Sequence, residues 1–415
     1  MARLSAPALL RIRRIWLKHH AGSAERGRVD LDSLLRHAVD GGASDVHLKV
    51  GQPPILRHDG SLRAAEGWLP LTDRQLEEVL VTVTAHDSAR RAGFDQTGDL
   101  DLAYMPPGLP RMRVNGFRQR GAISFAFRVI PTKVPGFTDL GLPEGIEQLA
   151  NEPRGLVLCT GATGSGKTTT LAAMIGHINA TRPCHIVTIE DPIEILHDDR
   201  LGIVNQREIG LDTPSFNEAL RRALRQDPDV ILIGEMRDAE TAQTAMQAAE
   251  SGHLVLSTLH TTDAAESINR IVEFFPPQKH QQIRSILAGV LRGAISQRLL
   301  PRIDRGRVAA VEVMINNARI ADLIRENRTG EIEEAIADGA FFKMQTFTQA
   351  LIALVLGGQV DREVAANAAG NKHDFLVALD RAVKERAEEE RKEAEEEATA
   401  TGHPAGLRMV QRADL

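Results

Sequence analysis

The segment Gly161-Ala162-Thr163-Gly164-Ser165-Gly166-Lys167-Thr168 fits the phosphate-loop pattern Gly-x-x-x-x-Gly-Lys-Ser/Thr at every fixed position. An apolar run, Leu156-Val-Leu-Cys159, precedes it, and a stretch with helical spacing begins at Thr169. Glycines let such a loop curl until its N–H groups and the helix N-terminus face phosphate oxygens. Residues 161–169 are therefore predicted to bind ATP, with Lys167 on the β/γ-phosphates and Thr168 holding Mg²⁺. The alternative is a glycine-rich turn with an incidental lysine.

Outward from this loop, three more continuous apolar runs occur at residues 186–189, 230–233 and 254–257. Buried parallel strands have this composition, and longer stretches with helical spacing lie between them. Residues 137–372 are therefore predicted to form a doubly wound α/β domain.

Four further regions differ in composition. Residues 1–28 carry seven Lys/Arg and one acid, which predicts a basic, flexible extension. Residues 29–132 alternate short apolar runs with Gly, Pro and Asp, as expected for a small α+β domain. Residues 133–136 contain Pro and Gly and predict a linker, and residues 373–415 predict a charged helical tail that ends in disorder.

The overall composition excludes several classes of protein. The net charge is −6, and no basic, aromatic-rich stripe is present, so direct binding of nucleic acid is not expected. Two cysteines exclude a disulfide scaffold and a tetracysteine zinc site. No apolar run approaches the ~20 residues of a membrane span, and residues 1–20 lack the features of a secretory signal. We expect a cytoplasmic protein.

Two acidic motifs follow predicted strands. Glu190 and Asp191 lie in Thr188-Ile-Glu-Asp-Pro-Ile-Glu194, and Glu235 ends Val230-Ile-Leu-Ile-Gly-Glu235. Ligands of open α/β sheets bind beyond the carboxyl ends of strands, where both motifs fall. Glu235 and Glu190 are the candidates for orienting the attacking water and ordering the metal shell, with Asp191 as a possible outer ligand. The alternative is that either acid simply favours a helix N-terminus.

Two histidines flank another predicted strand in Ser251-Gly-His253-Leu-Val-Leu-Ser-Thr-Leu-His260-Thr-Thr262. His260 stands at the carboxyl end, where a polar side chain would sense the γ-phosphate, whereas His253 stands at the other end. Satisfied structural histidines are the alternative for both. Their spacing does not resemble a metal site.

Together these motifs resemble the type II/IV secretion ATPase superfamily, whose phosphate loop, Asp box (residues 188–194), Gly-Glu element and His box (residues 251–262) occur in this order. The resemblance covers about residues 30–370. It implies a RecA-like ATPase domain behind a PAS-like domain, six subunits in a ring, and ATP with Mg²⁺. It also implies docking under an inner-membrane pilus platform protein, at the cytoplasmic face. Glu194 and His253 are carried over as motif residues.

Within that superfamily, two segments resemble the retraction ATPases of type IV pili. Residues 43–60 look like their short N-terminal domain, and residues 319–326 resemble the signature Ala-Ile-Arg-Asn-Leu-Ile-Arg-Glu. Leu323, Ile324, Arg325 and Glu326 match it, whereas Arg319, Ala321 and Asp322 depart from it. A plain amphipathic surface helix is the alternative for this segment.

The resemblance also implies that Arg113 and Arg128, on predicted strands of the N-terminal domain, reach a nucleotide between domains or subunits. Solvated strand arginines are the alternative. The resulting hypothesis is a motor that hydrolyses ATP to retract a pilus and so drives twitching motility. A pilus-extension or secretion ATPase, an accessory retraction paralogue, and a nucleotide-gated scaffold without turnover remain as alternatives.

Overall fold

The computed structural model describes residues 30–400 except 59, 86, 132 and 133. Its chain divides into two compact units, Met1–Lys133 with Glu194–Leu196, and Val134–Ile193 with His197–Leu415. The first division falls after residue 133, and residues 194–196 belong to the first unit although they lie within the sequence of the second. The predicted basic extension lies outside the described residues. Among the described helices, none has both the length and the apolar character needed to cross a membrane.

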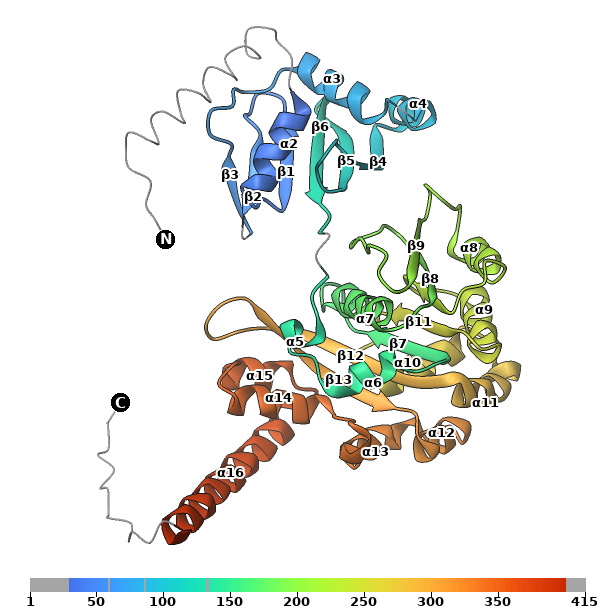
Figure 1. Ribbon diagram of the computed structural model, residues 1–415, viewed down its shortest axis with the longest axis vertical. Coiled ribbons are helices and arrows are strands. Elements are labelled where there is room, and N and C mark those ends of the chain that lie inside the picture. The colour runs from blue at the N-terminus through green and yellow to red at the C-terminus, as the bar shows by residue number, and fades with distance from the viewer. Residues whose placement is uncertain (1–29, 59, 86, 132–133, 401–415) are drawn as a thin grey trace. The chain divides into compact units, whose positions relative to one another are not determined.

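The first unit is built on a six-stranded antiparallel sheet (Figure 1), in the order β3-β2-β1-β6-β5-β4. The strands are β1 (Asp45–Lys49), β2 (Ile55–His58), β3 (Ser61–Ala64), β4 (Asp99–Tyr104), β5 (Met112–Gln119) and β6 (Ala122–Val129). Three helices accompany it: α2 (Leu31–Asp40), α3 (Asp73–Val83) and α4 (Ser88–Thr97). Thr72 and Gln75 form a capping box that starts α3. This arrangement is the α+β domain predicted from the alternating runs.

The two faces of this sheet differ because side chains alternate along each strand. Val46, Phe127 and Val114 share one face and are fully buried in a single core with α2 and α3. The opposite face carries a row of directly paired polar residues, in the order Arg57, Asp45, Arg128 and Arg113. The hydrophobic effect therefore fixes the register of the sheet and leaves the charged row off the core.

The second unit contains a seven-stranded sheet in the order β13-β12-β7-β11-β10-β8-β9. Its strands are β7 (Gly155–Thr160), β8 (His185–Glu190), β9 (Ile203–Glu208), β10 (Val230–Ile233), β11 (Leu254–Leu259), β12 (Leu291–Pro301) and β13 (Arg307–Ile315). All neighbours are parallel except β12 and β13. Strands β7, β10 and β11 are buried along their whole length, as their continuous apolar runs predicted.

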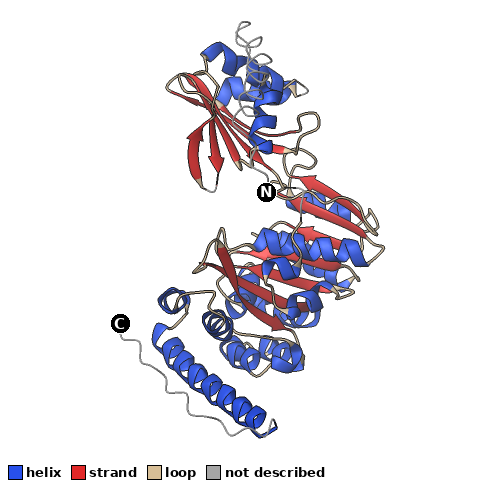
Figure 2. Cartoon of the chain, turned by 60° about the vertical axis from the view of Figure 1, so that its left-hand side comes forward, coloured by secondary structure: helices blue, strands red, loops and turns tan. Residues whose placement is uncertain are grey.

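Helices cover both faces of this sheet (Figure 2). They are α5 (Phe137–Leu140), α6 (Glu144–Ala150), α7 (Lys167–Thr181), α8 (Phe216–Ala223), α9 (Ala239–Glu250), α10 (Ala264–Glu273) and α11 (His280–Val290), with a 3-10 turn, η1 (Pro277–Lys279), before the last. Parallel crossovers are right-handed. Helix α7 leads from β7 toward β8, and α8 to α11 lead the other way along the sheet, so they lie on opposite faces.

The remaining helices follow β13 at the C-terminal side. They are α12 (Ala318–Arg325), α13 (Ile332–Ala337), α14 (Phe347–Leu356), α15 (Arg362–Ala368) and α16 (Lys372–Ala400), with the 3-10 turns η2 (Thr329–Glu331) and η3 (Ala340–Phe342). Phe375 and Leu379 of α16 are buried in a separate cluster with Phe347 and Leu300. The predicted boundary at residue 373 therefore falls inside a packed region, because these two apolar side chains start the charged helix. Helix α16 continues to residue 400, and the rest of the predicted tail lies outside the described residues.

Candidate active site

The phosphate loop connects β7 to α7 and depends on three glycines in the left-handed region. Gly161, Gly164 and Gly166 have φ of 140°, 79° and 96°. Such angles are costly for residues with a Cβ. At Gly161 a Cβ would also lie 2.5 Å from the carbonyl oxygen of Gln297, whereas at Gly164 nothing lies within 4 Å. The loop is thus packed on the strand side and open at its middle.

The polar groups of this loop are held inside it. Lys167 is buried, and its Nζ donates to the carbonyl oxygens of Gly161 and Ala162, at 2.7 and 3.0 Å. Ser165 is also buried, and its Oγ makes no hydrogen bond among the described residues. A buried ammonium, an orphaned hydroxyl and an open glycine cradle fit a phosphate group that would supply the acceptors.

Glu190 stands at the carboxyl end of β8 and is almost fully buried. Its Oε1 accepts hydrogen bonds from Thr188 Oγ1 at 2.6 Å and from Gln206 Nε2 at 3.0 Å. These two donors orient the carboxylate and compensate for its burial. Asp191 follows it and is exposed. The described residues contain no group of three or more His, Cys, Asp or Glu side chains arranged so that it could hold a metal ion.

Glu235 follows the neighbouring strand β10, and His260 follows β11. His260 Nε2 lies 3.1 Å from Glu235 Oε2, and Arg237 forms an ion pair with the other carboxylate oxygen. The strand ends are tied together, because Gly234 N–H donates to Ile189 C=O and Thr258 Oγ1 donates to Gly234 C=O. The ends of β8, β10 and β11 therefore bring Glu190, Glu235 and His260 to one edge of the sheet.

The pKa of His260 is lowered by partial burial and by the positive charges of Lys167 and Arg237. The electrostatic influence of Lys167 connects this histidine with the phosphate loop. A neutral imidazole at neutral pH can donate or accept one hydrogen bond without adding charge.

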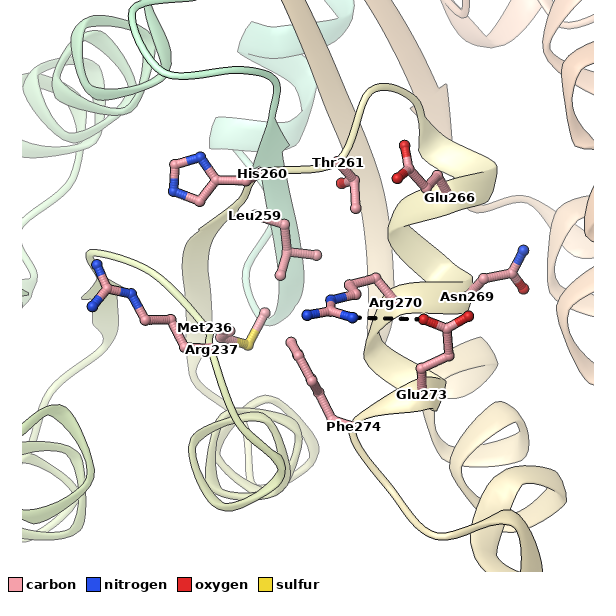
Figure 3. Close-up of a pocket in the computed structure, with 10 residues that line it drawn as sticks. All are labelled: Met236, Arg237, Leu259, His260, Thr261, Glu266, Asn269, Arg270, Glu273 and Phe274. Carbon is pink, nitrogen blue, oxygen red and sulfur yellow. Dashed lines mark ion pairs between the residues drawn. The ribbon is translucent and has the colours of Figure 1, made fainter.

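A pocket of about 520 Å³ lies beside these groups (Figure 3). Arg237 and His260 line one side, and side chains of α10 line the other. Arg270 of α10 pairs with Glu273 at 3.7 Å and lies over the ring of Phe274. His260, the partner of Glu235, thus lines a pocket with charged walls.

Several predicted residues lie elsewhere. His253 stands at the amino end of β11, where its Nδ1 lies 2.9 Å from the carbonyl oxygen of Ala248 at the end of α9, so it serves the fold and not this edge. Leu323 and Ile324 are buried on the inner face of α12, whereas Arg325 and Glu326 are exposed. Glu194 is exposed and belongs to the first unit.

Arg113 and Arg128 stand opposite each other on β5 and β6 of the first unit. Arg128 Nε donates to the buried carboxylate of Asp45 at 2.8 Å, and Arg113 lies 3.6 Å from Asp101. Both guanidinium groups remain largely exposed.

Sequence reasoning missed three residues at this site. Arg237 lies two residues after the end of the Gly-Glu motif and could have been found from that position. Gln206 and Gln297 carry no local signal, because they approach the site only through the pairing of β9 with β8 and of β12 with β7.

The phosphate loop, the buried lysine and two carboxylates at adjacent strand ends define a P-loop nucleoside triphosphatase. The sequence profile of the type II/IV secretion system protein family matches residues 28–342. The type IV pilus retraction ATPase PilT of Pseudomonas aeruginosa is 45% identical over 347 residues, which cover 84% of this chain and 100% of that relative. A twitching motility protein of Neisseria gonorrhoeae is 44% identical over 78% of this chain and 86% of its own length.

Solved structures agree with these relatives. A crystal structure of the pilus retraction motor PilT with bound ADP has a TM-score of 0.78 and 43% identity, covering 83% of this chain and 98% of that one. The ATPase DotB of Legionella pneumophila has a TM-score of 0.67 and 30% identity, covering 81% and 94%. The chain therefore belongs to the type II/IV secretion system protein family, in its PilT-type branch, and is a nucleotide-binding ATPase. This family membership argues against the alternative of a nucleotide-gated scaffold without ATP turnover.

Proposed function

We propose that this ATPase powers retraction of a type IV pilus, as a ring of six copies at the cytoplasmic face of an inner-membrane platform protein. The observation that carries the proposal is the 45% identity to a retraction ATPase along the whole length of that relative. A type IV pilus assembly ATPase, PilB of Pseudomonas aeruginosa, is 35% identical over 60% of this chain. The intact phosphate loop and both carboxylates support turnover.

In this proposal, the N–H groups of residues 161–169 and the Lys167 ammonium bind the phosphates of ATP. The ammonium exchanges its present partners, the carbonyl oxygens of Gly161 and Ala162, for β/γ-phosphate oxygens. Thr168, assisted by Glu190 and Asp191, would hold Mg²⁺, which neutralises phosphate charge when bound.

Glu235 is the proposed water-orienting carboxylate, because it lies at a strand end and contacts His260. Arg237 pairs with one of its oxygens, and the remaining lone pairs of the carboxylate can accept a hydrogen bond from water. Through its contact with Glu235, His260 would couple the presence of the γ-phosphate to the orientation of that carboxylate. Arg113 and Arg128 are the proposed arginine fingers for a nucleotide on a neighbouring copy.

A deletion strain tests the proposal directly. Retraction requires that cells without the gene carry excess surface pili and lose twitching, and that the wild-type gene restores twitching. A gene encoding Glu235→Gln should fail to restore it despite equal protein levels. Loss of surface pili in the deletion strain would identify an extension motor instead.

An accessory role is the second candidate, favoured by the departures at Arg319, Ala321 and Asp322 and by 40% identity to the type IV pilus ATPase PilU of Pseudomonas aeruginosa. An accessory motor would leave retraction active in the deletion strain and reduce only its force. Retraction force on single pili, measured in an optical trap, distinguishes the two.

A further inference from the structure

Strand β12 runs past the end of the strand that carries the phosphate loop. It pairs in parallel with β7 as far as Ser296 opposite Thr160. There β7 ends and the loop begins at Gly161, while β12 continues to Pro301. Residues 297–300 therefore lie alongside the phosphate loop, where no strand intervenes.

Gln297 connects this extension to the nucleotide-binding elements. Its amide is fully buried: Nε2 donates to Thr170 Oγ1 at 2.9 Å, and Oε1 accepts from Cys159 Sγ at 3.3 Å. Thr170 lies in the first turn of α7, three residues after Lys167. The amide therefore joins the strand before the loop to the helix after it, using both of its polar atoms.

The loop itself rests on the same extension. A Cβ at Gly161 would meet the Gln297 carbonyl oxygen at 2.5 Å, and one at Gly166 would lie 3.6 Å from Leu299 Cδ1. Gln297 and Leu299 are two positions apart and share one face of β12. They form the floor beneath the first and last glycines of the loop.

The alternate residues of β12 hold the C-terminal helices. Arg298 donates through Nη1 to the carbonyl oxygen of Ala368 at the end of α15, and its Cζ lies 4.2 Å from the ring centroid of Phe347 in α14. Leu300 is buried in the cluster that α14, α15 and the start of α16 share. One short strand thus packs against the phosphate loop and against these helices.

We propose that Gln297 is a positioning residue for the phosphate loop, and that residues 297–300 transmit nucleotide occupancy to helices α14, α15 and α16. Close-packed elements respond to small displacements by repacking, because they contain no free volume to absorb them. A loop that closes on phosphate displaces Gln297 and Leu299, and the strand passes this displacement to Arg298 and Leu300. Gln297 acts at the nucleotide site, so this role does not depend on which pilus step the motor drives.

The first test weakens the Gln297–Thr170 hydrogen bond without changing size. Thr170→Val removes the hydroxyl and leaves the buried amide unsatisfied, whereas Thr170→Ser keeps the acceptor and is the matched control. We expect Thr170→Val to raise the ADP Kd and the ATP KM about tenfold, with kcat changed far less, and Thr170→Ser to restore both. ADP binding within twofold of wild type in Thr170→Val would overturn the positioning role.

The second test follows transmission by hydrogen exchange on the full chain, with and without saturating ADP. ADP should change the exchange of peptides covering residues 347–368 in the wild type. Arg298→Met should abolish that change while retaining ADP affinity. The control Arg292→Met, at the other end of β12, should keep it, because Arg292 contacts Glu152 and Arg154 and not these helices.

Two results would contradict transmission. One is that ADP does not change the hydrogen exchange of residues 347–368 in the wild type, and the other is that ADP changes it as much in Arg298→Met as in the wild type. Thr170→Val provides an independent measurement should Arg298→Met fail to fold. At saturating ADP this variant should show a smaller exchange change in residues 347–368 than wild type, and an equal change would count against the proposal.

Discussion

His260 Nε2 lies 3.1 Å from Glu235 Oε2, although the two residues stand 25 positions apart and end different strands. The contact joins the candidate water-orienting carboxylate to the only motif histidine at the nucleotide edge of the described sheet. Because Arg237 forms an ion pair with the other oxygen, each carboxylate oxygen of Glu235 contacts a charged or polar side chain. These two contacts hold the carboxylate in one orientation.

Glu235→Gln should bind ATP with near-normal affinity and lower kcat about 100-fold or more, because an amide cannot accept a proton from water. Lys167→Ala should instead lose nucleotide binding, because it removes the buried ammonium. Filter binding and phosphate release measure the two effects separately. Near-normal turnover in Glu235→Gln would transfer the catalytic role to Glu190.

Arg113→Ala should bind ATP and hydrolyse it slowly, without loss of stability, because the contact of its side chain among the described residues is an exposed ion pair with Asp101. Arg128→Ala should also be less stable, since it removes the 2.8 Å partner of the buried Asp45 carboxylate. Mixing Arg113→Ala with Lys167→Ala subunits should restore some activity if the finger serves a neighbouring copy. Inactive mixtures in confirmed hexamers would argue against action in trans.

Leu323→Ala should lower the free energy of unfolding by about 2–5 kcal/mol, because Leu323 is buried in the main core. The double variant Arg325→Ala/Glu326→Ala should leave folding and ATPase activity nearly unchanged, since both side chains make exposed ion pairs. We expect that variant to abolish pilus retraction by removing an output surface. Normal retraction would assign α12 a structural role only.

Glu312→Gln should change the pH dependence of stability. Glu312 is buried on β13, accepts the N–H of Ala264 at 2.9 Å, and has a pKa raised to about 7, mainly by burial and further by Asp263 and Glu333. The folded state therefore holds this proton more tightly than the unfolded chain. Its stabilisation is complete below pH 4.5 and is lost as pH rises to about 7.

The glutamine keeps an acceptor for Ala264 N–H and cannot ionise. Across that interval, wild type should lose about 3 kcal/mol relative to Glu312→Gln. Chemical denaturation of both proteins at pH 4.5, 6 and 8 measures the difference. A difference that is constant with pH would show that Glu312 ionises freely in the folded state.

Local patterns were sufficient for the phosphate loop, the buried strands and the inner face of α12. Each depends on residues within one turn or one strand, so the positions of Lys167 after a buried strand, Glu235 at a strand end and Leu323 on a buried helix face followed from local sequence, whereas their roles stay predictions. The choice between the two histidines also followed from strand direction: His260 faces the nucleotide edge and His253 does not.

Long-range pairing supplied the rest. Gln206 reaches Glu190 only because β9 pairs with β8. Gln297 reaches Thr170 only because β12 continues beyond the end of β7. Phe375 and Leu379 were hidden in a helix whose charge dominates its composition. The roles of Arg113 and Arg128 remain predictions, because they concern a neighbouring copy.

Because Glu194–Leu196 belong to the first unit, they limit where this chain can be divided into separate fragments. Ile195 is buried, and Leu196 N–H donates to Pro131 C=O at 3.3 Å. A fragment that ends at residue 133 would lack residues 194–196, which pack with the first unit although they lie about sixty residues further along the chain. Domain exchange between related motors should therefore be designed with three junctions, one after residue 133 and one on each side of residues 194–196, so that this segment moves with the first unit. A chimera spliced once at the linker would inherit mismatched partners.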